Sequence, residues 1–405
     1  MRQHALPRRA VFAGLGFGSL AASLPAWAAG SVKLPLPGGP DERMMTTAFP
    51  GKGPMILQRT RPPLLETPFA VFDEGVFTPN DRFFVRWHWA SIPTEVDAAA
   101  FRLKVHGHVG TELALSLDDI AGLPRVEIAA INQCSGNSRG LFEPRVTGAQ
   151  WANGSMGNAR WTGVRLRDVL DKAGVKAGAV QVRFNGLDEP VVADGPDFKK
   201  SLDLDHARSE EVMIAYAMNG EQLPLLHGFP LRLIVPGWYS TYWVKMLCDV
   251  EVLDRPDEQF WMKTAYRIPD TPGANVKPGE TGFKTVPINR MVPRSFLTNL
   301  TSEAAVTAGA PLSLRGIAFG GDCGVKTVEV SPDGGKRWMP ASLGTDEGTY
   351  SFRRFEARLP ALGAGRHDLK VRCTNTAGLA QPMDPTWNAN GFMRNVVETT
   401  PVVAA

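Results

Sequence analysis

The hydrophobic residues of this 405-residue chain fall mostly into short runs, each about the length of one β-strand. Residues 101–105, 126–131 and 180–184 are examples, and polar or glycine-bearing turns follow them. Runs of this length and composition predict strands of a packed sheet. By the same criterion we expect strands at residues 83–89 and 243–252.

Two segments carry helical signals instead. The apolar positions of residues 166–173 recur at the spacing that places side chains on one face of a helix, and Gly174 follows as a stop signal. Ser116, with Asp119 three residues later, is typical of a capping box at a helix start.

The pattern changes after residues 278–293, which are punctuated by proline and glycine. Short strand-like runs follow, with a turn sequence at residues 331–335; the runs lie at residues 312–319, 325–330, 352–359 and 369–373. Strands at this spacing over about 100 residues predict an immunoglobulin-like sandwich. The expected fold class is therefore α+β, with a mixed α/β domain at residues 73–285 and an all-β sandwich at residues 286–405.

The N-terminal residues have a different character. Residues 1–28 contain Arg8 and Arg9 before a short apolar stretch and end in Ala-Trp-Ala, as a cleaved signal peptide does. The paired arginines favour twin-arginine export, which carries folded proteins to the periplasm. Residues 29–72 are rich in proline and glycine without a sustained period, so an extended arm is expected there.

Composition excludes several classes of protein. A chain of this length with 43% hydrophobic residues is neither disordered nor too small for a substantial core. Its formal charge of +3 disappears once Arg2, Arg8 and Arg9 are removed, which argues against nucleic-acid binding. No apolar run has the length of a stable membrane span.

The number and spacing of the cysteines limit which metal, haem and disulfide sites the chain can form. Only four occur, at positions 134, 248, 323 and 373, and no C-x-x-C motif is present. Zinc ribbons and covalent haem attachment therefore have no support. Cys248 suits a small buried hydrophobe, and Cys323 and Cys373 would need the geometry of a disulfide that sequence cannot establish.

Cys134 stands out because a predicted strand delivers it into the small, polar loop of residues 132–140. A thiolate is stabilised by a metal or a nearby cation, and Arg139 lies five residues on. Gly136 and Gly140 would let the backbone approach a bulky group. These features fit a soft metal ligand, although a structural cysteine in a turn fits them equally well.

Several motifs in order resemble the sulfite oxidase family of molybdenum enzymes. Residues 134–137 with Arg139 resemble that family's Cys-Ala-Gly-Asn-Arg loop, and residues 83–88 look like its Phe-Phe-Val-Arg-Asn-His segment. Residues 227–232, followed by two segments up to Lys245, resemble its pterin-binding segments. The similarity runs from about Phe83 to the C-terminus and is closest to the bacterial periplasmic sulfite dehydrogenases.

The resemblance implies a molybdenum–molybdopterin cofactor, with Cys134 as the metal ligand. It implies that the pterin is bound by Phe83, Arg86, His88, Asp188, His227, Arg232, Trp243 and Lys245. It implies catalytic roles for Tyr266, Arg86, Arg139 and, if a two-residue gap is allowed, Trp151. Without it, Arg86 and His88 would be an arginine in a surface pair and a packed histidine at a strand end.

The chain also departs from the family pattern. Vertebrate members have a substrate-pocket arginine where this chain has Asn390, so Arg394 either replaces it or leaves a less basic pocket. No b-type haem region precedes Phe83, so we expect no haem in this chain. Trp387 and Asn388 match the signature of the family's dimerisation domain.

The resulting hypothesis is a periplasmic enzyme that oxidises sulfite and passes electrons singly to a c-type cytochrome or similar carrier. It would assemble as a homodimer or as a heterodimer with a cytochrome subunit. Two alternatives are a molybdopterin S- or N-oxide reductase, of the methionine sulfoxide type, and a non-catalytic periplasmic binding module.

Overall fold

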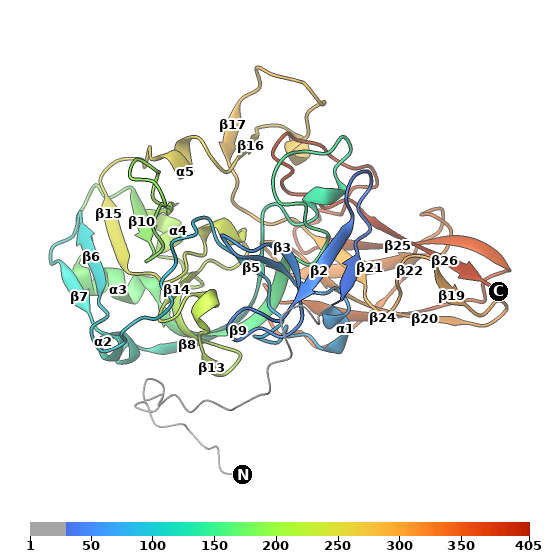
Figure 1. The fold of residues 1–405 in the computed structure, drawn as a ribbon, viewed down its shortest axis with the longest axis horizontal. Coiled ribbons are helices and arrows are strands. Elements are labelled where there is room, and N and C mark those ends of the chain that lie inside the picture. The colour runs from blue at the N-terminus through green and yellow to red at the C-terminus, as the bar shows by residue number, and fades with distance from the viewer. Residues whose placement is uncertain (1–29) are drawn as a thin grey trace, which may run out of the picture.

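The computed structural model describes residues 30–405 as an elongated molecule with a broad lobe and a narrower β-sandwich extending from it (Figure 1). The expected signal peptide at residues 1–28 lies outside the described residues. No helix within residues 30–405 has both the length and the apolarity that crossing a membrane requires.

The proline- and glycine-rich arm, which the sequence predicts as extended, contributes four strands to a five-stranded sheet. The strands pair in chain order as β1 (Ser31–Lys33), β2 (Glu42–Thr46), β3 (Met55–Arg59), β4 (Leu64–Glu66) and β5 (Val85–Arg86), of which β5 lies beyond the arm. Strands of two to five residues are too short to show a period, so the sequence pattern did not reveal them. The strand predicted at residues 83–89 likewise shrinks to β5 alone.

Two further sheets make up the broad lobe. One has the order β11 (Lys199–Asp203), β10 (Gln181–Asn185), β15 (Asp249–Leu253), β6 (Leu103–Gly107) and β7 (Leu113–Leu115). The other has the order β13 (Glu221–Gln222), β12 (Met213–Met218), β9 (Met156–Arg165) and β8 (Arg125–Gln133), with β14 (Arg232–Ile234) on β12. Buried residues from both sheets form one hydrophobic core, so the strands predicted at residues 101–105, 126–131 and 180–184 are confirmed with small shifts.

The helices are short. The longest, α3 (Leu166–Ala173), buries its apolar face and ends at Gly174 with φ of 68°, as predicted. The capping box at Ser116 is also present and begins α2 (Leu117–Ala121). The others are α1 (Val71–Glu74), α4 (Leu204–Ala207) and α5 (Phe260–Lys263), so the lobe is richer in sheet than the mixed α/β prediction implied.

Another prediction was wrong at residues 243–248. Of the strand expected at residues 243–252, only the end forms, as β15 (Asp249–Leu253). The preceding backbone turns at Met246, whose φ is 51°. The N–H groups of residues 246–248 bond to two distant segments: Met246 and Leu247 to the carbonyls of Gly228 and Leu231, and Cys248 to that of Asn185. Tertiary hydrogen bonds therefore replace a ladder at this apolar run.

The C-terminal third is a sandwich of two sheets. One has the order β18 (Arg294–Leu297), β20 (Leu312–Phe319), β24 (Arg353–Leu359) and β23 (Ser342–Leu343). The other has the order β19 (Ala304–Val306), β26 (Glu398–Ala404), β25 (Gly365–Asn375), β21 (Val325–Ser331) and β22 (Met339–Pro340). Their facing side chains share one core, and β16 (Arg267–Pro269) with β17 (Thr285–Pro287) forms a ribbon in the connection.

All four strands predicted in this region are present within β20, β21, β24 and β25. The immunoglobulin-like topology of the sandwich and the domain boundary at residue 286 stay predictions. Cys323 and Cys373, which the sequence left open as a pair, are free thiols in this structure.

Candidate active site

Cys134 follows the last residue of β8 and is 6% exposed. Its N–H donates to the Ser155 carbonyl at 3.0 Å, and its own carbonyl accepts from the Asn137 N–H at 2.9 Å. The Asn137 side-chain oxygen accepts in turn from the backbone N–H and the hydroxyl of Ser155. The thiol is thus held by a loop that is hydrogen-bonded to Ser155 at both Cys134 and Asn137, as required of a residue presented at one fixed point.

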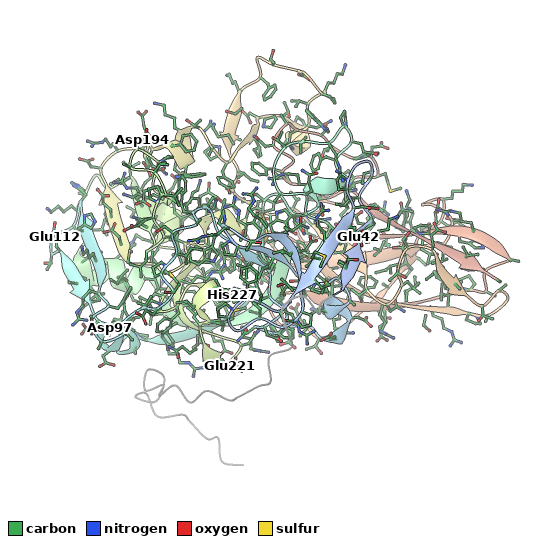
Figure 2. All side chains as sticks on the ribbon, in the orientation of Figure 1. Glu42, Asp97, Glu112, Asp194, Glu221 and His227 are labelled. Atoms are coloured by element: carbon green, nitrogen blue, oxygen red, sulfur yellow. The ribbon has the colours of Figure 1, made fainter. Side chains whose placement is uncertain are left out.

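Two cavities meet at this thiol. Both are lined by Arg86, His88, Cys134, Ser135 and Tyr266. The inner cavity is also lined by His227, which Figure 2 labels among the side chains of the molecule. The outer cavity is also lined by residues of the N-terminal sheet and by Arg139 and Trp151. Cys134 is therefore shared by the two compartments.

The inner cavity is strongly cationic. Arg232, 4% exposed, donates to the His227 carbonyl at 3.3 Å and to the Asn132 side-chain oxygen at 3.2 Å. Burial lowers its pKa to about 9. Its Nε, the Nδ2 of Asn132 and one terminal nitrogen of Arg86 are buried without a hydrogen-bond partner among residues 30–405. Such orphaned donors are costly unless a ligand accepts from them.

Lys245 and Trp243 complete this wall. Lys245 donates to the Arg86 carbonyl at 2.9 Å and lies 4.3 Å from the centre of the Trp87 ring. Its pKa is lowered first by burial and then by Arg232. Trp243 packs against Arg232, with its ring centre 5.9 Å from the guanidinium carbon.

Two predicted cofactor residues lie behind this wall. Phe83 is fully buried and packs its ring edge to face with His227 at 5.4 Å. Asp188 is 5% exposed, lies close enough to Lys245 for a charge interaction, and has its pKa raised to about 6 by burial. Neither residue lines either cavity, so the structure places both as supports of wall residues.

Lys52 is a residue that the sequence reasoning missed. It is 8% exposed, and its Nζ lies 2.7 Å from the Asn80 carbonyl, 2.8 Å from that of Phe83 and 2.5 Å from Nε2 of His227. Burial lowers the pKa of Lys52 to about 7 and holds that of His227 well below its usual value. Nε2 of the neutral ring therefore accepts from Lys52. A single lysine in a glycine-rich arm carries no sequence signal for this contact.

Tyr266 and His88 form the junction between the cavities. The Tyr266 hydroxyl lies 2.5 Å from Nε2 of His88, and the backbone φ of Tyr266 is 54°. Burial, followed by the charges of Arg86, Lys245 and Lys200, keeps the pKa of His88 well below its usual value. Burial also raises the pKa of Tyr266, so both groups are neutral. A single hydrogen lies between the phenol oxygen and Nε2 and forms the hydrogen bond. When Nε2 of His88 carries that hydrogen, the phenol proton is free to face the cavity.

Arg139 is held in a cradle of glycines. A Cβ at Gly136 would lie 2.4 Å from one terminal nitrogen of Arg139, and a Cβ at Gly148 would lie 2.9 Å from the other. A third glycine, Gly391, lies against the middle of the same side chain. The Nε of Arg139 donates to the Asn390 carbonyl at 3.0 Å. Side chains at these positions would push the guanidinium out of place.

Residues 387–393, from the C-terminal part of the chain, close the site from the outside. Met393 donates its N–H to the Ser135 carbonyl at 3.1 Å, and Asn390 donates its amide to the Arg267 carbonyl at 2.9 Å. The ring of Phe392 lies parallel to that of Tyr266 at 5.6 Å and 5.2 Å from the guanidinium carbon of Arg139.

Arg394 does not take the place of the arginine missing at Asn390. Its Nη1 pairs with the Glu398 carboxylate at 2.5 Å, and its side chain is 12% exposed. It lines neither of the two cavities that meet at Cys134.

Two family models match this chain. Residues 89–261 match the oxidoreductase molybdopterin binding domain, and residues 286–402 match the Mo-co oxidoreductase dimerisation domain. The chain is 34% identical to human mitochondrial sulfite oxidase over 354 residues, which are 83% of this chain and 63% of that protein. It is 31% identical to chicken (Gallus gallus) sulfite oxidase over 376 residues, 88% of this chain and 80% of that protein.

Relatives of other function are similar as well. A barley (Hordeum vulgare) NAD(P)H nitrate reductase is 30% identical over 352 residues, 80% of this chain and 39% of that protein. Among solved structures, the sulfane dehydrogenase SoxCD from Paracoccus pantotrophus has a TM-score of 0.72 at 23% identity. The match covers 96% of this chain and 92% of that one.

The fold and the site thus define a molybdopterin-binding oxidoreductase followed by a dimerisation-type domain. The chain belongs to the sulfite oxidase family of molybdenum enzymes. The donors on its walls fit such a cofactor, because a phosphate-bearing pterin requires cations and N–H donors in the inner cavity and a soft thiolate at its end. The chain spans about 63% of the length of the human relative, so the activity of that whole protein does not transfer directly.

Proposed function

We propose that this protein oxidises sulfite to sulfate with a molybdenum–molybdopterin cofactor. The observation that carries the proposal is the position of Cys134, between an inner cavity with buried cations and an outer cavity that holds Arg86 and Arg139. One compartment suits an anionic cofactor and the other a small anionic substrate.

In this proposal Cys134 ligates the metal, while Arg232, Lys245 and His227 hold the pterin and its phosphate. Lys52 fixes the ring of His227 through the contact to Nε2. When bound, the cofactor supplies the two-electron redox chemistry, and the protein supplies binding and orientation.

The substrate is a small oxyanion, and its charge decides which residues meet it. Arg86 and Arg139 stabilise it by charge-assisted hydrogen bonds, and Trp151, 1% exposed, keeps one side of the cavity free of water. Conversion of sulfite and water to sulfate releases two electrons and two protons. Tyr266 and His88 are the groups at the junction that can hold or move a proton, at the phenol oxygen and at Nε2.

The proposal includes the periplasm as the location and a c-type cytochrome or similar one-electron carrier as the acceptor. The two electrons of each turnover would leave one at a time. A homodimer, or a heterodimer with a cytochrome subunit, fits the match to a dimerisation domain. We propose no covalently attached haem for this chain, since it contains no C-x-x-C motif.

The test uses the full chain produced with molybdopterin. We expect about one molybdenum per chain and sulfite-dependent reduction of a one-electron dye. Cys134→Ser should abolish this activity and leave the thermal unfolding midpoint nearly unchanged, because a hydroxyl is a poor substitute for a soft thiolate ligand. Full sulfite oxidation by the serine variant would contradict the role of Cys134. Activity only with methionine sulfoxide and a reduced dye would support an S-oxide reductase instead.

A further inference from the structure

Arg59 lines the outer cavity and has no role in the site described so far. It is the last residue of β3 and belongs to the N-terminal sheet, whereas Arg86 and Arg139 come from β5 and from the loop after Cys134. The same sheet contributes Leu64 to the cavity wall.

Strand register explains why Arg59 reaches this wall. Arg59 pairs with Leu64 across β3 and β4, directly after a register shift between Leu57 and Arg59, and Leu64 pairs with Arg86 across β4 and β5. Residues directly opposite one another in antiparallel strands point to the same face. Strands are about 4.8 Å apart, so the backbones of Arg59 and Arg86 are separated by roughly 10 Å on that face. All three residues line the outer cavity, in agreement with the register.

The row ends at solvent with Arg59. Arg86 is partly buried next to Cys134, Leu64 is 4% exposed, and Arg59 is exposed. Within residues 30–405, Arg59 takes part in no hydrogen bond or ion pair of its side chain. Its charge is therefore uncompensated at the outer end of a row whose inner end is the proposed anion site.

We infer that Arg59 is an entrance arginine of the outer cavity, which binds the incoming oxyanion before Arg86 and Arg139 receive it. The inference rests on the proposed function and adds a specificity-determining residue to it. An exposed guanidinium keeps its hydration and gives a modest attraction that salt weakens. Arg59 lies about 10 Å from Arg86. At this distance it raises the rate at which the anion is captured and leaves the redox step unaltered.

Arg61 provides a matched control. It has the same charge, lies two residues further along the chain in the turn after β3 and is also exposed, but it does not line the cavity. Any effect of net charge alone would appear equally in Arg59→Gln and Arg61→Gln. An effect of position would appear in Arg59→Gln only.

The first measurement is the anaerobic reduction of the loaded enzyme by sulfite without an acceptor, because many one-electron dyes are charged. At low ionic strength, Arg59→Gln should raise the apparent Kd for sulfite about three- to fivefold and leave the limiting reduction rate unchanged, as expected for an exposed charge pair. Arg61→Gln should change Kd less than half as much, and Arg59→Lys should restore most of the affinity. Equal effects of the two glutamine variants, or a lower limiting rate in Arg59→Gln, would overturn the inference.

A second measurement separates this inference from the proposed function. Calorimetric titration with sulfate reports anion binding to the loaded protein without any turnover. If the protein does not oxidise sulfite but Arg59→Gln weakens sulfate binding relative to Arg61→Gln, the entrance role stands and the proposed function fails. If sulfite is oxidised and neither measurement distinguishes the two variants, the entrance role fails alone.

Discussion

Arg139 and Arg232 are both cationic and line different cavities that meet at Cys134. Their surroundings nevertheless suit them to different roles. Glycines and a backbone carbonyl hold Arg139 at the outer cavity, while two tryptophan rings, a carbonyl and an amide enclose Arg232. Of these two arginines, only Arg232 has a buried guanidinium N–H without a partner among residues 30–405. One side chain is placed for an exchanging anion and the other for a permanent ligand.

This difference predicts opposite defects. Arg139→Gln should raise the KM for sulfite roughly ten- to a hundredfold with normal molybdenum content, because a charge-assisted hydrogen bond contributes about 1.5–3 kcal/mol. Arg232→Gln should lower the pterin and molybdenum content first, and activity in proportion. Metal analysis combined with steady-state kinetics checks both. Equal loss of metal in the two variants would show that Arg139 is structural.

At the scale of elements, residues 387–393 connect the C-terminal part of the chain to the proposed catalytic groups. Phe392 is 7% exposed and contacts both the Tyr266 ring and the Arg139 guanidinium. Its backbone is fixed by Asn388, whose amide oxygen accepts from the Phe392 N–H at 3.0 Å. The segment therefore positions two proposed active-site side chains without touching the substrate.

Replacing Phe392 by Leu should raise the KM for sulfite and lower kcat several-fold, since ring stacking and cation–π contact each contribute about 0.5–1.5 kcal/mol. Phe392→Tyr, which keeps the aromatic face, should recover most of both parameters. Phe352→Leu is the control, because Phe352 is buried in the same hydrophobic cluster but packs edge to face against Phe72. Similar kinetics in the two leucine variants would indicate general destabilisation.

These elements also show how far the sequence could predict the site. The α3 helix follows from local pattern, because its hydrogen bonds are formed within the segment itself, and the strand that leads to Cys134 follows from its apolar run, although its loop bonds to residues 151–155. The backbone of residues 243–248 could not be predicted, since its partners come from distant segments. Lys52 and Phe392 were missed for the same reason: each acts through a contact with a residue more than a hundred positions away.

Across the whole molecule, a notable feature is buried positive charge. Lys52 and Lys200 are enclosed, and burial lowers the pKa of each to about 7; burial lowers the pKa of Lys245 as well. Lysines in the unfolded chain keep their protons up to about pH 10.4. Between these values the unfolded state binds more protons than the folded state, so folding becomes more favourable as pH rises.

This linkage predicts that the cofactor-free protein gains stability between about pH 7.5 and 9. Each lysine can contribute up to about 1.4 kcal/mol per pH unit in that window. This pH range lies above the titration of the buried carboxyls Glu66 and Asp188, because burial raises their pKa values only to about 7 and 6. In the upper part of the window the thiols of Cys248 and Cys373, whose pKa values burial raises to about 12, oppose the lysines and flatten the slope, because unfolded thiols ionise from about pH 8.5.

The cofactor should reduce this pH dependence. An anionic group in the inner cavity stabilises the protonated forms of Lys245 and Lys52, so their folded pKa values rise toward the unfolded value and their contribution to the slope shrinks. Lys200, whose Nζ donates to the Trp261 carbonyl outside the inner wall, should keep its share. Urea unfolding of the cofactor-free and loaded proteins at several pH values in the window measures both slopes. An identical slope in the two forms would mean that the cofactor leaves these lysines unaffected, against the cationic inner site.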